Sequence, residues 1–235
     1  MHLELKGRVA LVTGGSRGIG AAIVRGLARE GCRVTFTHLG DAERAAAVPG
    51  EAIEADVSDF AAAERVVADV QPSILICNAG IAADRVIWKM SEDEWDRVLD
   101  VNLKGCFNYC RAVAPQLRAR DDGRIVTIAS INGLRGKFGQ VNYAAAKGGV
   151  LALTKSVARE LGRSGATVNA VAPGMVRTDM VGELPEEFLA AAETESVLGR
   201  ISEPDDVADL VVFLCSARAR QITGQVIQVD GGQYI

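Results

Sequence analysis

The feature that most constrains this chain is a regular alternation of short apolar segments with longer helical ones. Continuous apolar strands are typical of a parallel sheet that is buried on both faces, and parallel neighbours need a helical crossover between them. The alternation therefore predicts an α/β fold, with a doubly wound parallel sheet of about seven strands and helices on both faces. We expect strands at 8–13, 33–37, 52–55, 74–77, 123–129, 167–171 and 225–229, helices at 19–30, 60–70, 92–120, 143–162 and 204–216, and a short irregular helix within 41–49.

Composition excludes several other classes of protein. No linker, repeat or low-complexity segment interrupts the pattern, so residues 1–235 are expected to form one domain. The net charge of −4 and the lack of a Lys/Arg-rich run argue against nucleic acid, and no apolar stretch is long enough to span a membrane. Five cysteines without a CxxC pair indicate buried free thiols rather than disulfides or metal ligands, which favours a cytoplasmic location.

A glycine-rich turn follows the first predicted strand and opens the first predicted helix. Glycines at Gly14, Gly18 and Gly20 allow the backbone to turn sharply and to approach a diphosphate, which the helix N-terminus attracts. A tight strand–helix turn without a ligand is the alternative. The position in the chain is the context that favours a dinucleotide, so we expect a single Rossmann-type NAD(P)-binding domain.

The end of the second strand bears on the choice of cofactor. An acidic residue there would hold the adenosine ribose and favour NAD, but the first carboxylate after the strand is Asp41. Arg17 in the glycine turn is suited to a 2′-phosphate. These features favour NADP(H), although Arg17 as a solvated residue and His38 as a loop residue remain alternatives. After the third strand, Asp56 and Val57 either contact the adenine or, in the case of Asp56, cap a helix.

A hydroxyl, a phenol and an amine are spaced along the second half of the chain. Lys147 follows Tyr143 by one helical turn, so the two side chains share a helix face, and Ser130 precedes them. A cation beside a phenol stabilises the phenolate and lowers its pKa. The three residues are therefore candidates for acid catalysis, with an ordinary amphipathic helix as the alternative.

The motifs taken together closely resemble the short-chain dehydrogenase/reductase family, essentially from end to end. Within that family, two segments are similar to the 3-oxoacyl-thioester reductases of fatty-acid synthesis, namely NAGIAADRVIWKMSEDEWDRVLDVNLKG and GQVNYAAAKGG. The motifs that carry the resemblance are TGGSRGIG at 13–20, Asn78-Ala79-Gly80, Asn102 in VNLKG, Ser130, Tyr143 with Lys147, Pro173-Gly174 with Thr178, and VDGG at 229–232.

The resemblance implies NADPH-dependent reduction of a 3-oxoacyl thioester, in the first place one on acyl carrier protein, in fatty-acid or related lipid or polyketide synthesis. Tyr143 would protonate the ketone oxygen, Ser130 would hydrogen-bond it, and Lys147 would lower the Tyr143 pKa and hold the nicotinamide ribose. Asn102 would distort its helix and hold a water that relays protons to Lys147. The cofactor contacts implied are Gly14, Ser16, Arg17, Gly18, Ile19, Gly20, His38, Asp56, Val57, Asn78, Ala79, Gly80, Tyr143, Lys147, Pro173, Gly174, Val176 and Thr178.

Two alternatives remain open for the function. The motifs define the reaction centre and not the acyl pocket, so a reductase or dehydrogenase of a CoA thioester or of a small secondary alcohol is one of them. The other is a non-catalytic nucleotide-sensing protein on the same fold. Against the second, Ser130, Tyr143, Lys147 and Asn102 are all present.

Departures from the family pattern concern the carrier and the edge of the domain. Cys77 stands where asparagine is common, and residues 40–56 and 70–74 are shorter than usual. Carrier-protein reductases typically show two arginines at the active-site mouth, and the corresponding residues are Asp121 and Ser164. An acidic carrier needs a basic docking patch, so these two positions weaken the expectation of a carrier protein.

A substrate lid is expected around residues 180–200, after the Pro-Gly turn, with a surface helix pair as the alternative. The resemblance also implies a homotetramer in which the long helices pack against other subunits.

Overall fold

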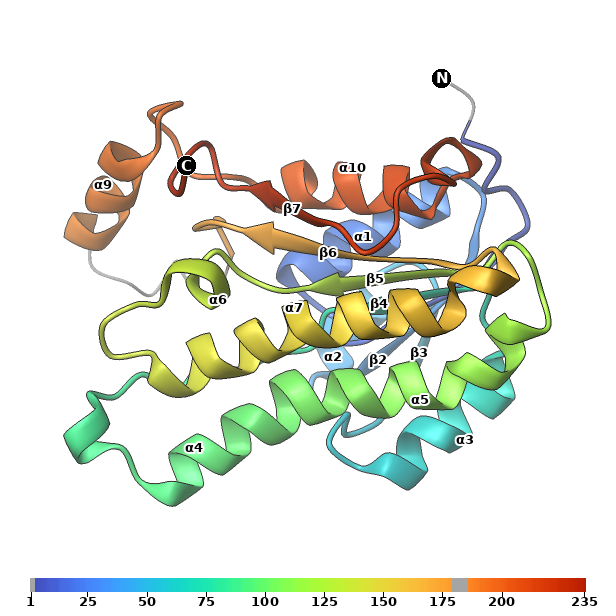
Figure 1. Cartoon of the computed structure of the whole chain (residues 1–235), viewed down its shortest axis with the longest axis horizontal. Coiled ribbons are helices and arrows are strands. Elements are labelled where there is room, and N and C mark those ends of the chain that lie inside the picture. The colour runs from blue at the N-terminus through green and yellow to red at the C-terminus, as the bar shows by residue number, and fades with distance from the viewer. Residues whose placement is uncertain (1–2, 179–185) are drawn as a thin grey trace.

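The computed structural model describes residues 3–178 and 186–235, and its centre is one seven-stranded sheet (Figure 1). Every pairing is parallel, and the strand order is β3-β2-β1-β4-β5-β6-β7. This order reverses direction between β1 and β4, as in doubly wound nucleotide-binding folds. The strands are β1 (Val9–Val12), β2 (Arg33–His38), β3 (Glu51–Glu54), β4 (Ile74–Cys77), β5 (Arg124–Ile128), β6 (Thr167–Pro173) and β7 (Val226–Val229).

Helices cover both faces of the sheet, so the predicted fold class is confirmed (Figure 1). On one face α1 packs against α10, and on the other α5 packs against both α3 and α7. The main helices are α1 (Gly18–Arg29), α2 (Ala42–Ala46), α3 (Phe60–Val70), α4 (Glu92–Leu99), α5 (Gly105–Arg118), α6 (Asn132–Arg135), α7 (Val141–Leu161), α9 (Glu186–Glu195) and α10 (Pro204–Cys215).

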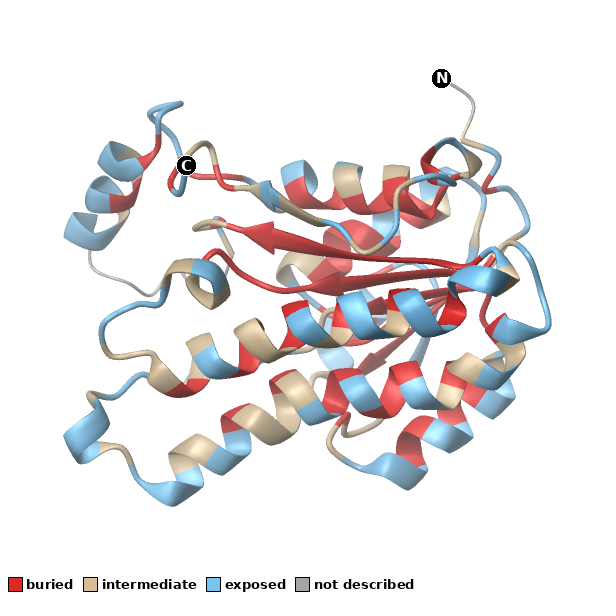
Figure 2. Ribbon diagram, viewed as in Figure 1, coloured by how far each residue is buried: buried red, intermediate tan, exposed pale blue. Residues whose placement is uncertain are grey.

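The neighbouring strands β1 and β4 are apolar in every position because they are covered on both faces (Figure 2). In β1, Ala10 and Val12 belong to the core under α1 and α10, whereas Leu11 belongs to the core under α3, α5 and α7. Successive side chains of a strand point to opposite faces, so one apolar strand contributes to two cores.

The predicted helix over 92–120 is present from Glu92 to Arg118, and its middle is distorted. The turn Asp100–Lys104, between α4 and α5, is π-helical. Asn102 lies in it, and its side chain accepts a hydrogen bond from the Ile81 N–H at 2.8 Å and donates to the Ile81 carbonyl at 2.9 Å. These two bonds stabilise the distortion that the family resemblance implies for this helix.

Among the described residues, two α-helices lie outside the predicted set. The short α6 follows β5, and α9 occupies part of the region for which a lid is predicted; residues 180–185 of that region lie outside the described residues. No helix in the described part of the chain is long and apolar enough to cross a membrane.

Candidate active site

The glycine turn lies at the carboxyl edge of the sheet, between β1 and α1. Gly14 and Gly18 adopt positive φ angles of 66° and 53°, which favour glycine. A Cβ at Gly20 would lie 2.0 Å from the Gly14 carbonyl oxygen, so no larger residue fits there without moving the turn. The turn therefore leaves its backbone bare at a helix N-terminus, the arrangement that suits a diphosphate.

Asn78, which follows β4, stabilises the glycine turn by hydrogen bonds. Its side-chain amide donates to the carbonyls of Thr13 and Gly14 at 3.0 and 2.9 Å. The Thr13 hydroxyl accepts from the backbone N–H groups of Asn78 and Ala79 at 3.0 and 3.1 Å. A Cβ at Gly80 would lie 3.2 Å from the Asn102 side-chain oxygen and 3.4 Å from the Lys147 Nζ, so this strand end joins the turn to the catalytic candidates.

The structure brings Ser130, Tyr143 and Lys147 together at the same edge. Ser130 follows β5, and its Oγ accepts a hydrogen bond from the Asn132 N–H at 3.1 Å. Tyr143 and Lys147 lie one turn apart on α7, and the Lys147 Nζ is 5.7 Å from the centre of the Tyr143 ring. Lys147 is buried and donates to the Ile128 carbonyl at 2.7 Å.

Burial dominates the electrostatics of Tyr143 and Lys147. It raises the pKa of the Tyr143 phenol above its ordinary value, a hydrogen bond with Ser130 opposes this shift, and the negative charge of Asp84 adds to it. Burial lowers the pKa of the Lys147 ammonium to about 8, against the influence of Cys106 and Cys77. In the chain by itself desolvation is therefore the main influence on the Tyr143 pKa, and its lowering by Lys147 together with the positive nicotinamide ring stays a prediction.

A small enclosed cavity of about 10 Å³ lies beside Lys147 and Asn102. This is about the space that one water molecule needs, and the site is polar enough to hold one. The cavity is therefore a place for the relay water that the resemblance implies, and that water stays a prediction. The rest of the wall includes Thr13 after β1, Cys77 of β4, Cys106 of α5 and Ile128 of β5.

A larger surface hollow, of about 390 Å³, lies outside the glycine turn. Arg17, Arg25 and Arg44 all line it, of which only Arg17 is predicted from the sequence. Arg25 is two turns further along α1, and Arg44 lies in α2, so their convergence depends on the fold. Asp41 is also close, accepting from the Ser16 hydroxyl at 2.9 Å and lying 4.0 Å from Arg44.

His38 and Asp56, which are also predicted at the adenosine end, differ in their hydrogen bonds. His38 ends β2, is buried, and has no hydrogen-bond partner for its Nδ1 within the described residues. Asp56 accepts from the Ser58 N–H and hydroxyl, both at 2.8 Å, and it does not cap α3, since Asp59 does so by accepting from Ala62 N–H. The helix-cap alternative for Asp56 is wrong, whereas an adenine contact stays a prediction.

The segment after β6 reaches back to the glycine turn. Pro173 ends β6, and Val176 forms a parallel bridge with Ser202. A Cβ at Gly18 would lie 3.2 Å from the Thr178 methyl carbon, so Thr178 lies over the turn, as a nicotinamide-side residue should. Its contact with a cofactor remains a prediction.

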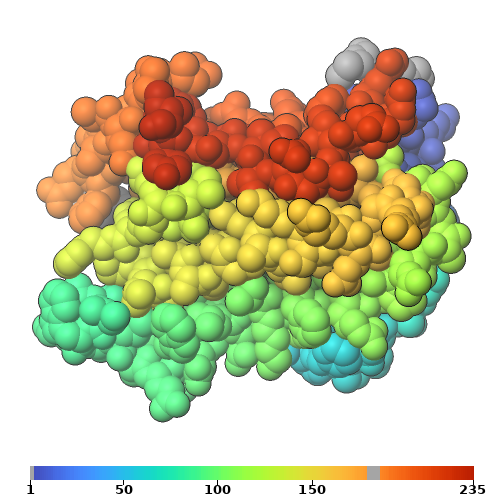
Figure 3. All heavy atoms as spheres, in the orientation of Figure 1, coloured from blue at the N-terminus to red at the C-terminus, as the bar shows by residue number. Residues whose placement is uncertain are grey.

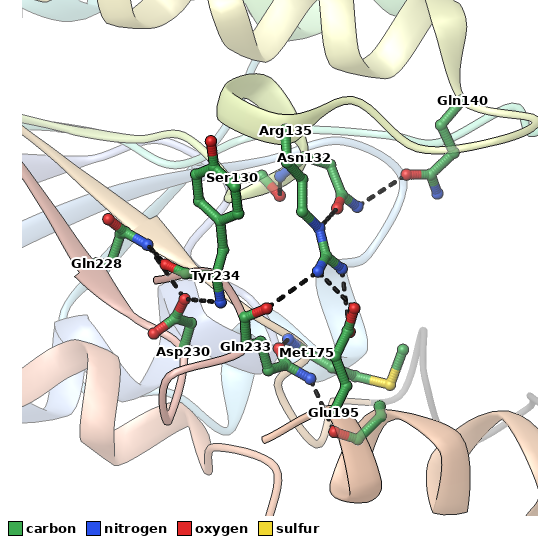
Figure 4. A network of polar contacts seen from close by, with 11 residues as sticks. Ser130, Asn132, Arg135, Gln140, Met175, Glu195, Gln228, Asp230, Gln233 and Tyr234 are labelled. Carbon is green, nitrogen blue, oxygen red and sulfur yellow. Dashed lines mark hydrogen bonds and ion pairs between the residues drawn. The ribbon is translucent and has the colours of Figure 1, made fainter. Parts of the chain in front are cut away.

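A cover, which we define as α9 and the C-terminal residues 230–235, lies beside α6 and near Ser130 (Figures 3 and 4). Arg135 of α6 donates to both carboxylate oxygens of Glu195 in α9, at 2.6 and 3.1 Å, and to the Gln233 carbonyl at 3.2 Å. The Gln233 side chain accepts from the Met175 N–H at 2.8 Å and donates to the Ala192 carbonyl at 3.0 Å.

The same network reaches Ser130 through Asn132 (Figure 4). The Asn132 side chain accepts from Arg135 at 3.2 Å and donates to Gln140 at 3.0 Å. Gln140 in turn donates to Asp84 at 2.7 Å, the carboxylate whose charge acts on Tyr143. The cover is thus connected to the residue that holds the Ser130 hydroxyl.

The two predicted carrier-docking positions do not lie at the active-site mouth of this chain. Asp121 precedes β5 and Ser164 precedes β6, so both lie at the amino edge of the sheet, whereas Ser130 lies at the carboxyl edge. A Cβ on Gly165 would be 2.7 Å from the Asp121 carbonyl, so the two positions are neighbours. The expected placement is wrong because the length of β5 separates Asp121, which precedes this strand, from Ser130, which follows it.

A glycine turn on a doubly wound parallel sheet, with a serine, a tyrosine and a lysine at the same edge, defines a Rossmann-type oxidoreductase with a nicotinamide cofactor. Residues 14–233 match the model of a family described as enoyl-(acyl carrier protein) reductase. The chain belongs to the short-chain dehydrogenase/reductase family, as predicted.

Relatives with assigned activities narrow the class. The chain is 42% identical over 240 residues to the 3-oxoacyl-[acyl-carrier-protein] reductase FabG of Staphylococcus aureus, covering 96% of this chain and 98% of the relative. It is 46% identical over 237 residues to the acetoacetyl-CoA reductase of Rhizobium meliloti, covering 97% and 98%. A solved structure from Agrobacterium tumefaciens, described as a candidate gluconate dehydrogenase, has a TM-score of 0.94 and 32% identity, covering 99% and 98%. The chain is therefore similar to reductases of 3-oxoacyl thioesters.

Proposed function

We propose that the protein reduces 3-oxoacyl thioesters to 3-hydroxyacyl thioesters with NADPH, using Ser130, Tyr143 and Lys147. The observation that carries this proposal is the meeting of these three side chains beside the bare glycine turn. Relatives named for this chemistry on both acyl-carrier-protein and CoA substrates support it.

The residues present fit a dinucleotide. The glycine turn cannot accept a side chain at Gly20, and the buried His38 Nδ1 is available to a ligand. Gly14, Gly18 and Gly20 would hold the diphosphate, Lys147 the nicotinamide ribose, and Thr178 the carboxamide. When bound, the cofactor supplies a hydride.

Each catalytic candidate has a separate task in this proposal. The Tyr143 phenol, with its raised pKa, stays protonated at neutral pH and can donate its proton to the ketone oxygen. Because the Ser130 Oγ already accepts from Asn132, its own hydrogen is left to donate to Tyr143 or to that oxygen. The Lys147 ammonium, near the Tyr143 ring, stabilises the negative charge that forms after proton transfer.

The preference for NADPH over NADH rests on the arginine-lined hollow. Arg17, Arg25 and Arg44 bring positive charge to the outer side of the glycine turn, where a 2′-phosphate would be recognised. Asp41 opposes this preference, since a carboxylate near the turn repels a phosphate. We propose that these three arginines, with Arg177 on the same hollow, outweigh Asp41, and that Arg17→Ala narrows the preference for NADPH over NADH.

Acyl carrier protein is the first candidate carrier, and coenzyme A is the second. Asp121 and the exposed Arg118, Arg120 and Arg163 all lie at the amino edge of the sheet, away from Ser130, so their charges favour neither carrier. We also propose that α9 and residues 196–200 act as a lid and that the protein is a homotetramer, for which the outward Phe107 of α5, 45% exposed, offers a contact.

The experiment that tests the proposal is a substrate panel with both cofactors. Acetoacetyl and longer 3-oxoacyl thioesters of acyl carrier protein and of coenzyme A are compared by the oxidation of NADPH and NADH. We expect turnover of the thioesters with NADPH ahead of NADH. Reduction of simple ketones alone, or no turnover of any thioester, would overturn the proposal.

A further inference from the structure

Three of the five cysteines meet inside the protein, away from any role in the proposed reaction. Cys77 ends β4, and Cys106 and Cys110 lie one turn apart on α5, facing it. The three sulfur atoms lie within 4.8 Å of one another, and those of Cys77 and Cys110 are 4.0 Å apart. All three residues are buried.

This spacing is close to that of three sulfurs around one metal ion. Zinc–sulfur bonds are about 2.3 Å long, so three thiolates in a plane around one ion are about 4.0 Å apart. At the upper limit of 4.8 Å, an ion at the centre would be about 2.8 Å from each sulfur, so a contraction of about half an ångström per ligand completes the site. Thiolates select soft ions over Mg²⁺ and Ca²⁺.

The charge balance is also favourable. Three thiolates and one divalent ion leave a single negative charge, which is costly to bury alone. The Lys147 Nζ lines the same small cavity as Cys77 and Cys106, and both cysteines raise the pKa of the Lys147 ammonium. The ammonium therefore compensates the negative charge of the loaded site.

We propose that Cys77, Cys106 and Cys110 form a trithiolate site for one thiophilic divalent ion, of which Zn²⁺ and Cd²⁺ are the probes. On binding, each thiol that is still protonated loses its proton to solvent while its sulfur forms a bond to the ion, and no electrons are transferred. The site does not require the proposed activity, although it shares Lys147 and one small cavity with the proposed active site.

The test is a Cd²⁺ titration of the full chain, kept reduced, followed by thiolate-to-metal charge-transfer absorption and by native mass spectrometry. We expect one ion per chain in the wild type and in Cys32→Ser, whose half-buried sulfur lies elsewhere and donates to the Leu5 carbonyl. Cys110→Ser should lose most of the absorption. Binding that is unchanged in Cys110→Ser, or lost equally in Cys32→Ser, would overturn the proposal.

A measurement on the wild type alone covers the case in which the variant does not fold. X-ray absorption at the cadmium edge counts the sulfur ligands of the bound ion. Three sulfurs support the site, whereas no bound ion, or an ion with one sulfur or none, overturns it.

Discussion

The catalytic side of the molecule and its cover are built in different ways. On the catalytic side, Asn78, Asn102 and Lys147 bond to backbone carbonyls of neighbouring elements, and Asn102 and Lys147 are buried. On the cover, α9 is held by the ion pair of Arg135 with Glu195, whose side chain is 46% exposed, and by the buried side chain of Gln233.

This difference indicates a division of labour. Removing one partner of a buried hydrogen bond costs about 1–3 kcal/mol, whereas exposed ion pairs contribute about 0.2–1 kcal/mol. The catalytic side is therefore expected to keep one geometry, and the cover to open at low cost. We infer that the catalytic side determines the rate of the chemical step and that the cover determines how tightly the substrate binds.

The largest effect is expected for Tyr143→Phe, which removes the proposed proton donor and keeps the ring. General acid catalysis contributes about 10²–10⁴-fold, so kcat should fall by that order. Steady-state kinetics measure this fall, and fluorescence titration should show NADPH binding within about twofold of wild type. A variant with full activity would remove the basis of the mechanism.

The next effect concerns the glycine turn. In Gly20→Ala the new Cβ would lie 2.0 Å from the Gly14 carbonyl oxygen, so the turn must move. Overpacking costs about 1–3 kcal/mol, and we expect NADPH to bind about 10- to 100-fold more weakly. Calorimetric titration measures the affinity. Gly162→Ala is the matched control, because its Cβ would meet nothing within 4 Å; equal losses in both variants would contradict the prediction.

The pH dependence of reduction should follow Lys147. Its pKa is lowered to about 8, so the ammonium is lost as the pH rises through that value, while Tyr143 with its raised pKa remains protonated. We expect kcat/KM, which reports the free enzyme, to fall about tenfold per pH unit above that point.

The control for this profile is Lys147→Arg, because arginine stays charged in proteins. In the residual activity of Lys147→Arg, kcat/KM should begin to fall only at a higher pH than in the wild type. A wild-type profile that is flat until the tyrosine titrates would show that the ammonium is not required.

The smallest effect is expected for the cover. Arg135→Ala breaks the pair with Glu195, and an exposed pair of this kind should change KM for the thioester about two- to fivefold, with kcat kept. Arg120→Ala breaks another exposed ion pair, with Asp122, at the opposite edge of the sheet, and is the control with a CoA substrate. A fall in kcat for Arg135→Ala would show that the cover shapes the chemical step.

The sequence predicts the catalytic side better than the cover for a physical reason. Apolar strands and a glycine turn are local patterns, so the sheet, α1 and the pairing of Tyr143 with Lys147 follow from spacing along the chain. The π-helical distortion of the long helix at Asn102 follows only from the family resemblance. The Asn102 side chain bonds to Ile81, which is 21 residues away in the chain, so no local pattern predicts the distortion.

Other features depend on convergence in space and leave no local pattern. Arg25 and Arg44 reach one hollow from two helices, and Gln233 contacts backbone groups that any sequence provides. The raised pKa of Tyr143 depends on burial, which spacing alone does not reveal. The family comparison predicts Asp121 at the active-site mouth, but this residue precedes β5 and lies at the amino edge of the sheet. Counting positions along the chain does not show at which edge a residue lies.

The most direct test of this division of labour is a single-turnover measurement of NADPH oxidation at saturating acetoacetyl-CoA. The account predicts that Gln233→Ala, which removes the hydrogen bonds of that side chain with Met175 and with Ala192 of α9, keeps the wild-type rate and needs more substrate to reach it. Tyr143→Phe should lose the rate at any concentration. A Gln233→Ala variant that is as slow at saturation as Tyr143→Phe would contradict the account.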